Sequence, residues 1–192
     1  MFSGWQFSWQ DIIFIVITLL WWAEFRFFPS QKENKERKER SFQLILAAIL
    51  ITILLTIVFS LAHIGRVTPE RQMIFKNIGL IIYGLGIILR YWSSFLLGKY
   101  FTRSVSVDAD QKLVSTGPYR FLRHPLYLGL LLLTSGVPTY LGNIPALVFA
   151  PIIMFFALNK RMKYEEKLLE DELGNKYRRW KEDRAKLIPF IY

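Results

Sequence analysis

The sequence contains no cysteine and only two histidines, His63 and His124, among its 192 residues. The absence of cysteine excludes a disulfide scaffold, a thiolate metal site and a cysteine nucleophile. The two histidines lie far apart in the chain, which gives no basis for a histidine metal centre. We therefore predict neither a bound metal nor covalent catalysis through a thiol.

Charged residues are missing from long stretches of the chain and concentrated in others. The composition is 53% hydrophobic, and 25 Lys and Arg against 15 Asp and Glu give a net charge of +10. This separation into apolar and basic blocks excludes a disordered chain and argues against a soluble globule. The basic run at residues 31–40 (QKENKERKER) lacks base-stacking groups, so we interpret it as a linker beside anionic lipid headgroups, not as a nucleic-acid site. The sequence predicts one membrane-embedded domain over residues 1–192.

The apolar blocks predict an all-α integral membrane protein with five transmembrane helices. A helix needs about 20 apolar residues to cross a bilayer. The stretch from Pro125 to Asn159 carries no charge, is too long for one span and has turn-forming residues around Gly142, so it is predicted to form a helical hairpin. The predicted spans are residues 11–28, 41–62, 73–97, 125–140 and 144–159.

The remaining tail, residues 160–192, is predicted to form cytoplasmic amphipathic helices. Leu169, Leu173 and Trp180 recur at near-helical spacing, and Gly174 is typical of a helix C-cap. We expect this tail to cover the site as a lid or to lie on the membrane surface. The helix of the last span is expected to continue past Lys160 into the aqueous phase.

The distribution of Lys and Arg predicts the orientation. These residues are absent before Asp11, and there are five within residues 31–40 and ten after Asn159. The segments in between alternate between few and many Lys and Arg residues. The positive-inside rule then places the N-terminus outside and the C-terminus and active site in the cytoplasm. The start of the chain lacks a basic n-region, so its first apolar block is predicted to be an anchor and not a removed leader.

Folding the hairpin about Gly142 brings two distant segments together at the cytoplasmic face. Residues 113–127 should meet residues 159–166, with His124 level with Lys160. Ionisable groups gathered at a membrane boundary mark a candidate site. The gathered residues are Tyr119, Arg123, His124, Tyr127, Arg161, Glu165 and Glu166.

Each of these groups also has a structural interpretation. Arg161 and Glu165 are four residues apart on one helix face, where they could bind a ligand or form a surface ion pair. Glu165 and Glu166 are adjacent and point about 100° apart, which does not suit the paired carboxylates of a glycosidase-type hydrolase. His124 could be an interface residue before a helix that starts with proline. Arg90, in the third predicted span, is expected to snorkel towards the cytoplasmic interface.

Several pieces of the sequence resemble the isoprenylcysteine carboxyl methyltransferase family, one of the integral-membrane methyltransferase families that also include phospholipid methyltransferases. The resemblance covers roughly the C-terminal half, from Gly98 onwards. The matching pieces are LVSTGPYRFLRHPLY (113–127), the hairpin tip Gly142-Asn143-x-Pro145, the R-x-x-x-EE motif from Arg161 to Glu166, the following LLEDELGNKYRRW and the closing IPF (188–190).

The resemblance implies transfer of a methyl group from S-adenosylmethionine to a lipid-borne acceptor. It implies that Arg161 contacts the substrate and that Arg161 and Glu165 take part in catalysis. Family members that act on prenylcysteine tend to have His at the position of Gln111 and Gly-Thr-Gln at residues 135–137, which read Ser-Gly-Val here, so the acceptor stays open. The cofactor-binding residues that it implies are Leu113, Val114, Tyr119, His124, Pro125, Tyr127, Glu165 and Glu166.

Our first hypothesis is therefore O-methylation of a carboxylate on a lipid-like or isoprenoid-linked acceptor that enters from the bilayer. A carboxylate is already ionised at pH 7, so orientation and desolvation would suffice without a strong base. The alternative is N-, O- or S-methylation of a phospholipid or another small molecule. A different class is a non-enzymatic membrane scaffold or transporter component, although a transporter is expected to have broken helices at the membrane midplane.

Overall fold

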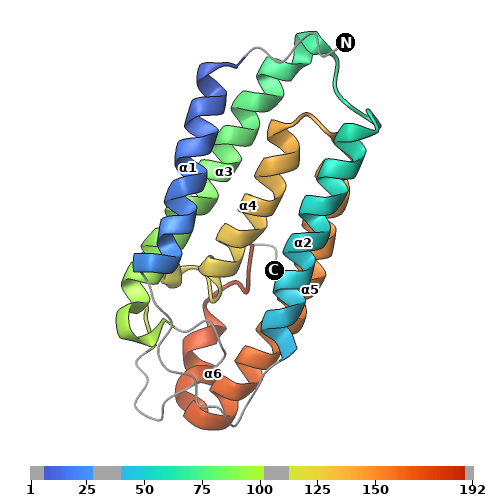
Figure 1. The fold of residues 1–192 in the computed structure, drawn as a ribbon. Helices are drawn as coiled ribbons and strands as arrows, with labels where there is room; N and C mark the ends of the chain where they lie inside the picture. The colour runs from blue at the N-terminus through green and yellow to red at the C-terminus, as the bar shows by residue number, and fades with distance from the viewer. Residues whose placement is uncertain (1–6, 28–39, 102–112, 189–192) are drawn as a thin grey trace.

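The computed structural model describes residues 7–27, 40–101 and 113–188. In these ranges the chain forms six α-helices and two short 3-10 helices, and no strand. The predicted all-α fold is confirmed (Figure 1). The elements are α1 (Trp9–Phe27), α2 (Arg40–Leu61), α3 (Pro69–Leu97), η1 (Gly98–Tyr100), η2 (Gly117–Arg120), α4 (Pro125–Tyr140), α5 (Ile144–Leu173) and α6 (Asn175–Glu182).

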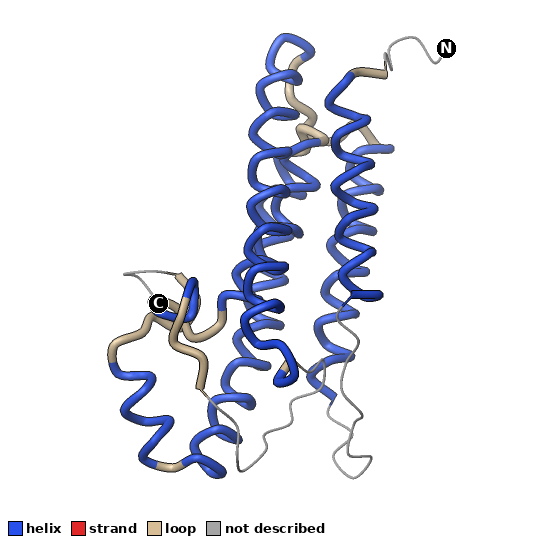
Figure 2. Tube along the Cα trace, turned by 90° about the vertical axis from the view of Figure 1, so that its left-hand side faces the viewer, coloured by secondary structure: helices blue, strands red, loops and turns tan. Residues whose placement is uncertain are grey.

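The first five α-helices run side by side as an elongated bundle, and α6 lies beyond the end at which α4 begins (Figures 1 and 2). α3 and α4 share the most extensive contact. α5 packs against α2 and α4, and α1 packs on α3. The α3–α4 pair therefore forms the centre of the bundle, with α1 on one side and α2 with α5 on the other.

Three of the helices, α2, α3 and α5, are long and apolar enough to cross a membrane. Large apolar side chains face outward on the bundle, among them Leu50 of α2 and Ile81 of α3, which are 66% and 62% exposed. An outward apolar surface on long helices is what a bilayer requires, because lipid solvates these side chains. The chain therefore has the character of an integral membrane protein.

The helix limits follow the predicted ones with one informative difference. α3 begins at Pro69 and not at residue 73, because proline occupies the first turn and Thr68 before it has extended backbone. α5 continues without interruption from Ile144 to Leu173, as expected for a helix that extends beyond the membrane. Gly174 caps α5 with a positive φ of 53°, and its N–H donates to the carbonyl of Glu170, which confirms the predicted C-cap.

The predicted hairpin is confirmed by the turn between α4 and α5. Gly142 has a φ of 64°, and the side chain of Asn143 caps α5 by accepting a hydrogen bond of 3.0 Å from Ala146 N. The turn also pairs with the loop before α3, since Val67 N donates to the Gly142 carbonyl at 2.9 Å. This tip fixes the relative height of the two arms, and hence which residues meet at their other ends.

Small residues allow α3 and α4 to approach closely. A Cβ placed on Gly86 would lie 2.8 Å from the carbonyl oxygen of Gly129, and one on Gly136 would lie 2.8 Å from the backbone N of Tyr83. Glycines at such helix crossings permit backbone-to-backbone packing in membrane proteins. The contact sets the register of the two helices and brings Arg90 level with the first turn of α4, where its Nη1 donates to the Leu126 carbonyl at 3.4 Å.

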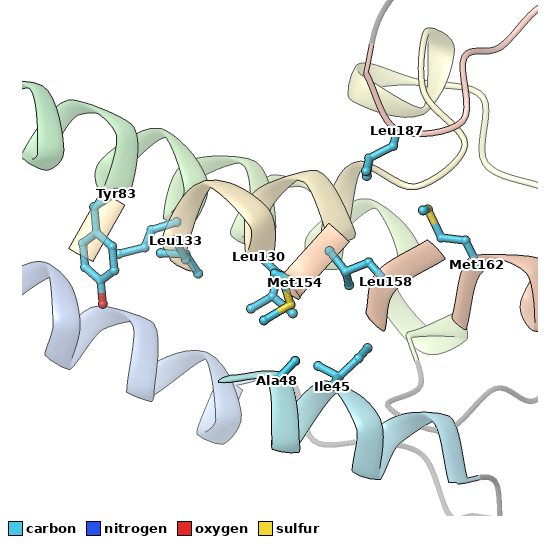
Figure 3. Packing of buried hydrophobic residues seen from close by; sticks show 10 residues of the cluster. Ile45, Ala48, Tyr83, Leu130, Leu133, Met154, Leu158, Met162 and Leu187 are labelled. Atoms are coloured by element: carbon cyan, nitrogen blue, oxygen red, sulfur yellow. The ribbon is translucent and has the colours of Figure 1, made fainter. Parts of the chain in front are cut away.

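A continuous apolar core fills the space between α2, α4 and α5. Met154, Leu158 and Met162 lie one turn apart on the buried face of α5, and each is 0% exposed. Figure 3 shows them in a row between the side chains of α2 and α4, with Leu187 of the C-terminal segment at the end. The core therefore leads along α5 towards the end of the bundle that contains the candidate site.

Arg90 has a partner that the sequence analysis did not foresee. It forms an ion pair with Glu24 of α1, whose side chain is only 2% exposed. The sequence analysis considered Arg90 alone, without a carboxylate from another helix. A buried arginine is acceptable when its charge is paired and hydrogen-bonded.

Candidate active site

Two segments far apart in the sequence meet at the end of the bundle where α4 begins. The hydroxyl of Tyr127 donates to Glu165 Oε2 at 2.6 Å and accepts from Arg161 Nε at 2.8 Å. The guanidinium of Arg161 also lies over the Tyr127 ring, 5.9 Å from its centroid. The tyrosine thus joins the arginine and the carboxylate that the sequence placed on one face of α5. The predicted convergence of residues 113–127 and 159–166 is borne out.

Glu166, the second carboxylate, is surrounded by basic side chains. Its Oε1 lies 2.8 Å from Arg123 Nη1 and 3.1 Å from His124 Nε2, and its Oε2 lies 3.9 Å from Lys186 Nζ. Lys186 in turn donates to Asn159 Oδ1 at 3.2 Å. Glu166 therefore ties α5 to the segment before α4 and to the C-terminal segment, whereas Glu165 is turned towards Tyr127.

His124 lies between the two carboxylates. It is the residue before α4, only 5% exposed, and its ring stacks on Tyr127 with a centroid distance of 5.4 Å. Its Nδ1 lies 3.9 Å from Glu165 Oε2, on the opposite edge from the nitrogen near Glu166. Pro125, buried at the first position of α4, fixes the backbone just beyond it. His124 is therefore part of the buried polar network and not a simple interface residue.

The C-terminal segment after α6 pairs with the segment before α4. The sequence predicted that the tail would cover the site or lie on the membrane surface, but it did not predict this pairing. Arg123 N donates to the Ala185 carbonyl at 2.9 Å, and Ala185 N donates to the Phe121 carbonyl at 3.0 Å. Leu122 and Ala185 thereby form a short parallel β-bridge. Nothing in the local sequence indicates this pairing; the resemblance at the closing residues, IPF, was the only available signal. Residues 189–192 lie outside the described ranges.

The predicted cofactor segment at Leu113 and Val114 is held by α6. Trp180 Nε1 donates to the Val114 carbonyl at 3.1 Å and to Ser115 Oγ at 2.9 Å. Leu113 and Val114 are themselves half-buried. The tail therefore packs against the site and does not extend away from it. Gln111, one of the two departures from the family pattern, lies outside the described residues.

Tyr119 lies in η2 and is 5% exposed. Burial raises the pKa of the Tyr119 hydroxyl well above its usual value, and the negative charge of Glu165 raises it further, against the opposing effect of Arg90. The phenol is therefore neutral at physiological pH. Arg184 holds this turn by donating from Nε to the Tyr119 carbonyl at 2.9 Å.

The arrangement combines buried charges of both signs with the end of an apolar core. In the part of the chain that the structure describes, no group of three or more His, Asp or Glu side chains could hold a metal ion. A site of this composition is suited to a ligand that carries an ammonium and a carboxylate, together with a second, apolar ligand. The fold and the site together define a membrane-embedded helical protein with a polar site at one end.

Comparison with known proteins then identifies its relatives. The model of the isoprenylcysteine carboxyl methyltransferase (ICMT) family matches residues 78–171, which contain most of α3, all of α4 and the site residues of α5. The resemblance found in the sequence is thus confirmed, and the chain is related to this family. The match begins earlier than Gly98, within α3, and ends before α6.

Individual relatives agree with the family match. Protein-S-isoprenylcysteine O-methyltransferase A of Arabidopsis thaliana is 34% identical over 120 residues, which is 60% of this chain and 60% of the relative. The Tribolium castaneum protein-S-isoprenylcysteine O-methyltransferase is 32% identical over 60% of this chain and 42% of its own length. The uncharacterized protein YpbQ of Bacillus subtilis is 25% identical over 73% of this chain and 85% of that protein.

The fold has a solved counterpart. The structure of the eukaryotic intramembrane Ras methyltransferase ICMT superposes with a TM-score of 0.64 and covers 95% of this chain and 65% of that one, at 21% sequence identity. The helix arrangement is therefore shared. This chain spans about 60% of the length of the Arabidopsis relatives that it matches.

Proposed function

We propose that this chain is a membrane methyltransferase that transfers the methyl group of S-adenosylmethionine to the carboxylate of a lipid-like acceptor, with an S-isoprenylcysteine as the first candidate. The observation that carries the proposal is the hydrogen-bonded series Arg161–Tyr127–Glu165 at the end of the apolar core. It offers one cation and one carboxylate, each held in place, beside apolar side chains. The names of the curated relatives support the same acceptor class.

The residues fit the cofactor by their chemistry. S-adenosylmethionine combines an amino-acid group, a sulfonium and an adenosine, and when bound it supplies a methyl group that a nucleophile can displace in line. Glu165 would hold the ammonium, and Tyr127 and Tyr119 would pack against apolar or cationic parts. The buried Nε of Arg123 meets no hydrogen-bond partner among the described residues, so a donor is left for a ligand. The other residues proposed to line the site are Leu113, Val114, His124, Pro125 and Glu166.

Arg161 is proposed to bind the acceptor. Its side chain is buried, and the bond from Nε to Tyr127 fixes the plane of the guanidinium. A fixed guanidinium is well suited to align a carboxylate, because its N–H groups form a rigid fork. The fully buried Leu158 and Met162 precede and follow it on α5, so the guanidinium lies beside apolar side chains. The chain's role in the reaction is thus to orient and desolvate the carboxylate.

We also propose that residues 1–192 form one domain in which α1 and α4 cross the membrane together with α2, α3 and α5, with the N-terminus outside and the site in the cytoplasm. The side-by-side packing of the five helices and the distribution of Lys and Arg support this topology. Because the chain has no cysteine, single cysteines at the exposed positions Lys163 and Ile64 can be labelled selectively. They should react from opposite sides of sealed vesicles; labelling from the same side would refute the topology.

The activity can be tested in membranes from cells that express the chain. Incubation with methyl-labelled S-adenosylmethionine and N-acetyl-S-farnesylcysteine should yield a labelled, base-labile methyl ester. If the label enters a phospholipid amine instead, the alternative acceptor is correct. Failure of the purified protein to bind S-adenosylmethionine by calorimetry would reject the methyltransferase class and favour a scaffold.

A further inference from the structure

The side chain of Tyr177 is an unexplained feature of α6. It is fully buried, with 0% exposure, and among the described residues its hydroxyl meets no hydrogen-bond partner. Buried tyrosine hydroxyls normally find a partner, because an unpaired polar group away from water is costly. A hydroxyl left in this state suggests that its partner is a ligand.

The position of Tyr177 supports this interpretation. Its ring stacks on Trp180 at 5.7 Å, and Trp180 holds the Val114 carbonyl of the predicted cofactor segment. Burial raises the pKa of Tyr177, and the charges of Glu166 and Glu165 raise it further. The side chain therefore packs on the residue that holds the loop at Val114, and it lies within electrostatic range of the α5 carboxylates.

A second buried donor without a partner lies in the same region. The Nε of Arg123 is unpaired among the described residues, although Nη1 of the same guanidinium contacts Glu166 at 2.8 Å. The charge of Arg123 also opposes the rise in the pKa of Tyr177, so the guanidinium lies within electrostatic range of the phenol. Two buried donors that lack acceptors indicate an anionic ligand group, since a carboxylate can accept from both.

We infer that Tyr177 and Arg123 bind the amino-acid carboxylate of S-adenosylmethionine, so that α6 supplies a ligand-binding residue of the active site. This inference rests on the proposed function and deepens it. The carboxylate would accept a hydrogen bond from the Tyr177 hydroxyl and another from Arg123 Nε, while Glu165 is left for the ammonium. The tail is then part of the binding site and not only its cover.

The experiment compares Tyr177→Phe with the wild type by calorimetry in detergent, using two ligands. The variant should bind S-adenosylmethionine about 3- to 10-fold more weakly, the effect of one lost hydrogen bond. It should bind decarboxylated S-adenosylmethionine as well as the wild type does, because that ligand lacks the group in question. The thermal stability of the ligand-free variant should be equal or higher, because the substitution removes an unpaired buried hydroxyl.

Tyr83→Phe provides the matched control, because Tyr83 is another buried tyrosine but lies on α3 and contacts Thr18 of α1, away from the site. It should leave both affinities unchanged. Equal losses for the two ligands, no loss for either, or a loss accompanied by lower stability of the free protein would overturn the inference. If the wild type binds neither ligand, the proposed function itself fails. If the wild type binds both ligands and Tyr177→Phe binds them equally well, only the inference about Tyr177 fails.

Discussion

Arg90 of α3 and Glu24 of α1 form a two-point ion pair within the helix bundle. Arg90 Nε donates to Glu24 Oε2 at 2.8 Å, and Nη2 donates to Oε1 at 2.5 Å. Arg90 also reaches the Leu126 carbonyl, at the first turn of α4. The pair therefore connects α1, which otherwise packs mainly on α3, to the helix that supplies half of the candidate site.

Replacing Glu24 by glutamine should destabilise the protein strongly. The substitution keeps the shape of the side chain but leaves the Arg90 charge buried without its counter-charge, which typically costs about 3–5 kcal/mol. The free energy of unfolding in mixed micelles measures the effect. The double variant Glu24→Gln/Arg90→Met should recover much of the loss, because it removes the unpaired charge. A single variant as stable as the wild type would show that water or lipid headgroups solvate Arg90.

The crossing of α3 and α4 gives a second prediction, on Gly129. A Cβ there would lie 2.6 Å from Arg90 Cγ and 2.9 Å from the Gly86 carbonyl oxygen, so Gly129→Ala must push the helices apart. We expect a loss of about 1–3 kcal/mol in unfolding free energy, typical of overpacking.

Gly84→Ala is the matched control for this substitution. Gly84 lies on α3 with nothing within 4 Å of its added Cβ. Alanine in a helix is favoured over glycine by about 1 kcal/mol, so this variant should be as stable as the wild type or more so. Equal losses at the two positions would mean that the crossing does not determine stability.

The comparison of sequence and structure shows which features local patterns can predict. The length of the uncharged stretch and the turn residues around Gly142 predicted the hairpin, and Gly174 predicted the end of α5. Each of these signals lies within one segment of the chain. The pairing of Glu24 with Arg90 and of Arg123 with Ala185 depends on how segments far apart in the chain pack, and no local pattern contains it. The roles of the gathered site residues, which the family resemblance implies, remain predictions.

The two adjacent carboxylates of α5 should respond differently to substitution. Glu166 is engaged by Arg123, His124 and Lys186, so Glu166→Gln should mainly lower stability, by about 1–3 kcal/mol, as charged hydrogen bonds are lost. Glu165 is proposed to hold the cofactor ammonium, so Glu165→Gln should weaken binding of S-adenosylmethionine about 10-fold or more with a smaller change in stability. Calorimetry and thermal unfolding of the two variants separate these effects. The reverse pattern would exchange the proposed roles.

Arg161 provides the last prediction, because it tests the acceptor half of the proposal separately from the cofactor half. If its guanidinium aligns the acceptor carboxylate, Arg161→Ala should lower kcat/KM for N-acetyl-S-farnesylcysteine by about 100-fold or more, as expected when a charged hydrogen-bonding partner is removed. Binding of S-adenosylmethionine should weaken far less.

Tyr127→Phe is the informative comparison, because it keeps the arginine but removes the hydroxyl that accepts from Arg161 Nε and donates to Glu165. It should impair turnover and cofactor binding together, since it releases both partners. If Arg161→Ala turns over the acceptor like the wild type, Arg161 is a structural residue and another group must bind the carboxylate.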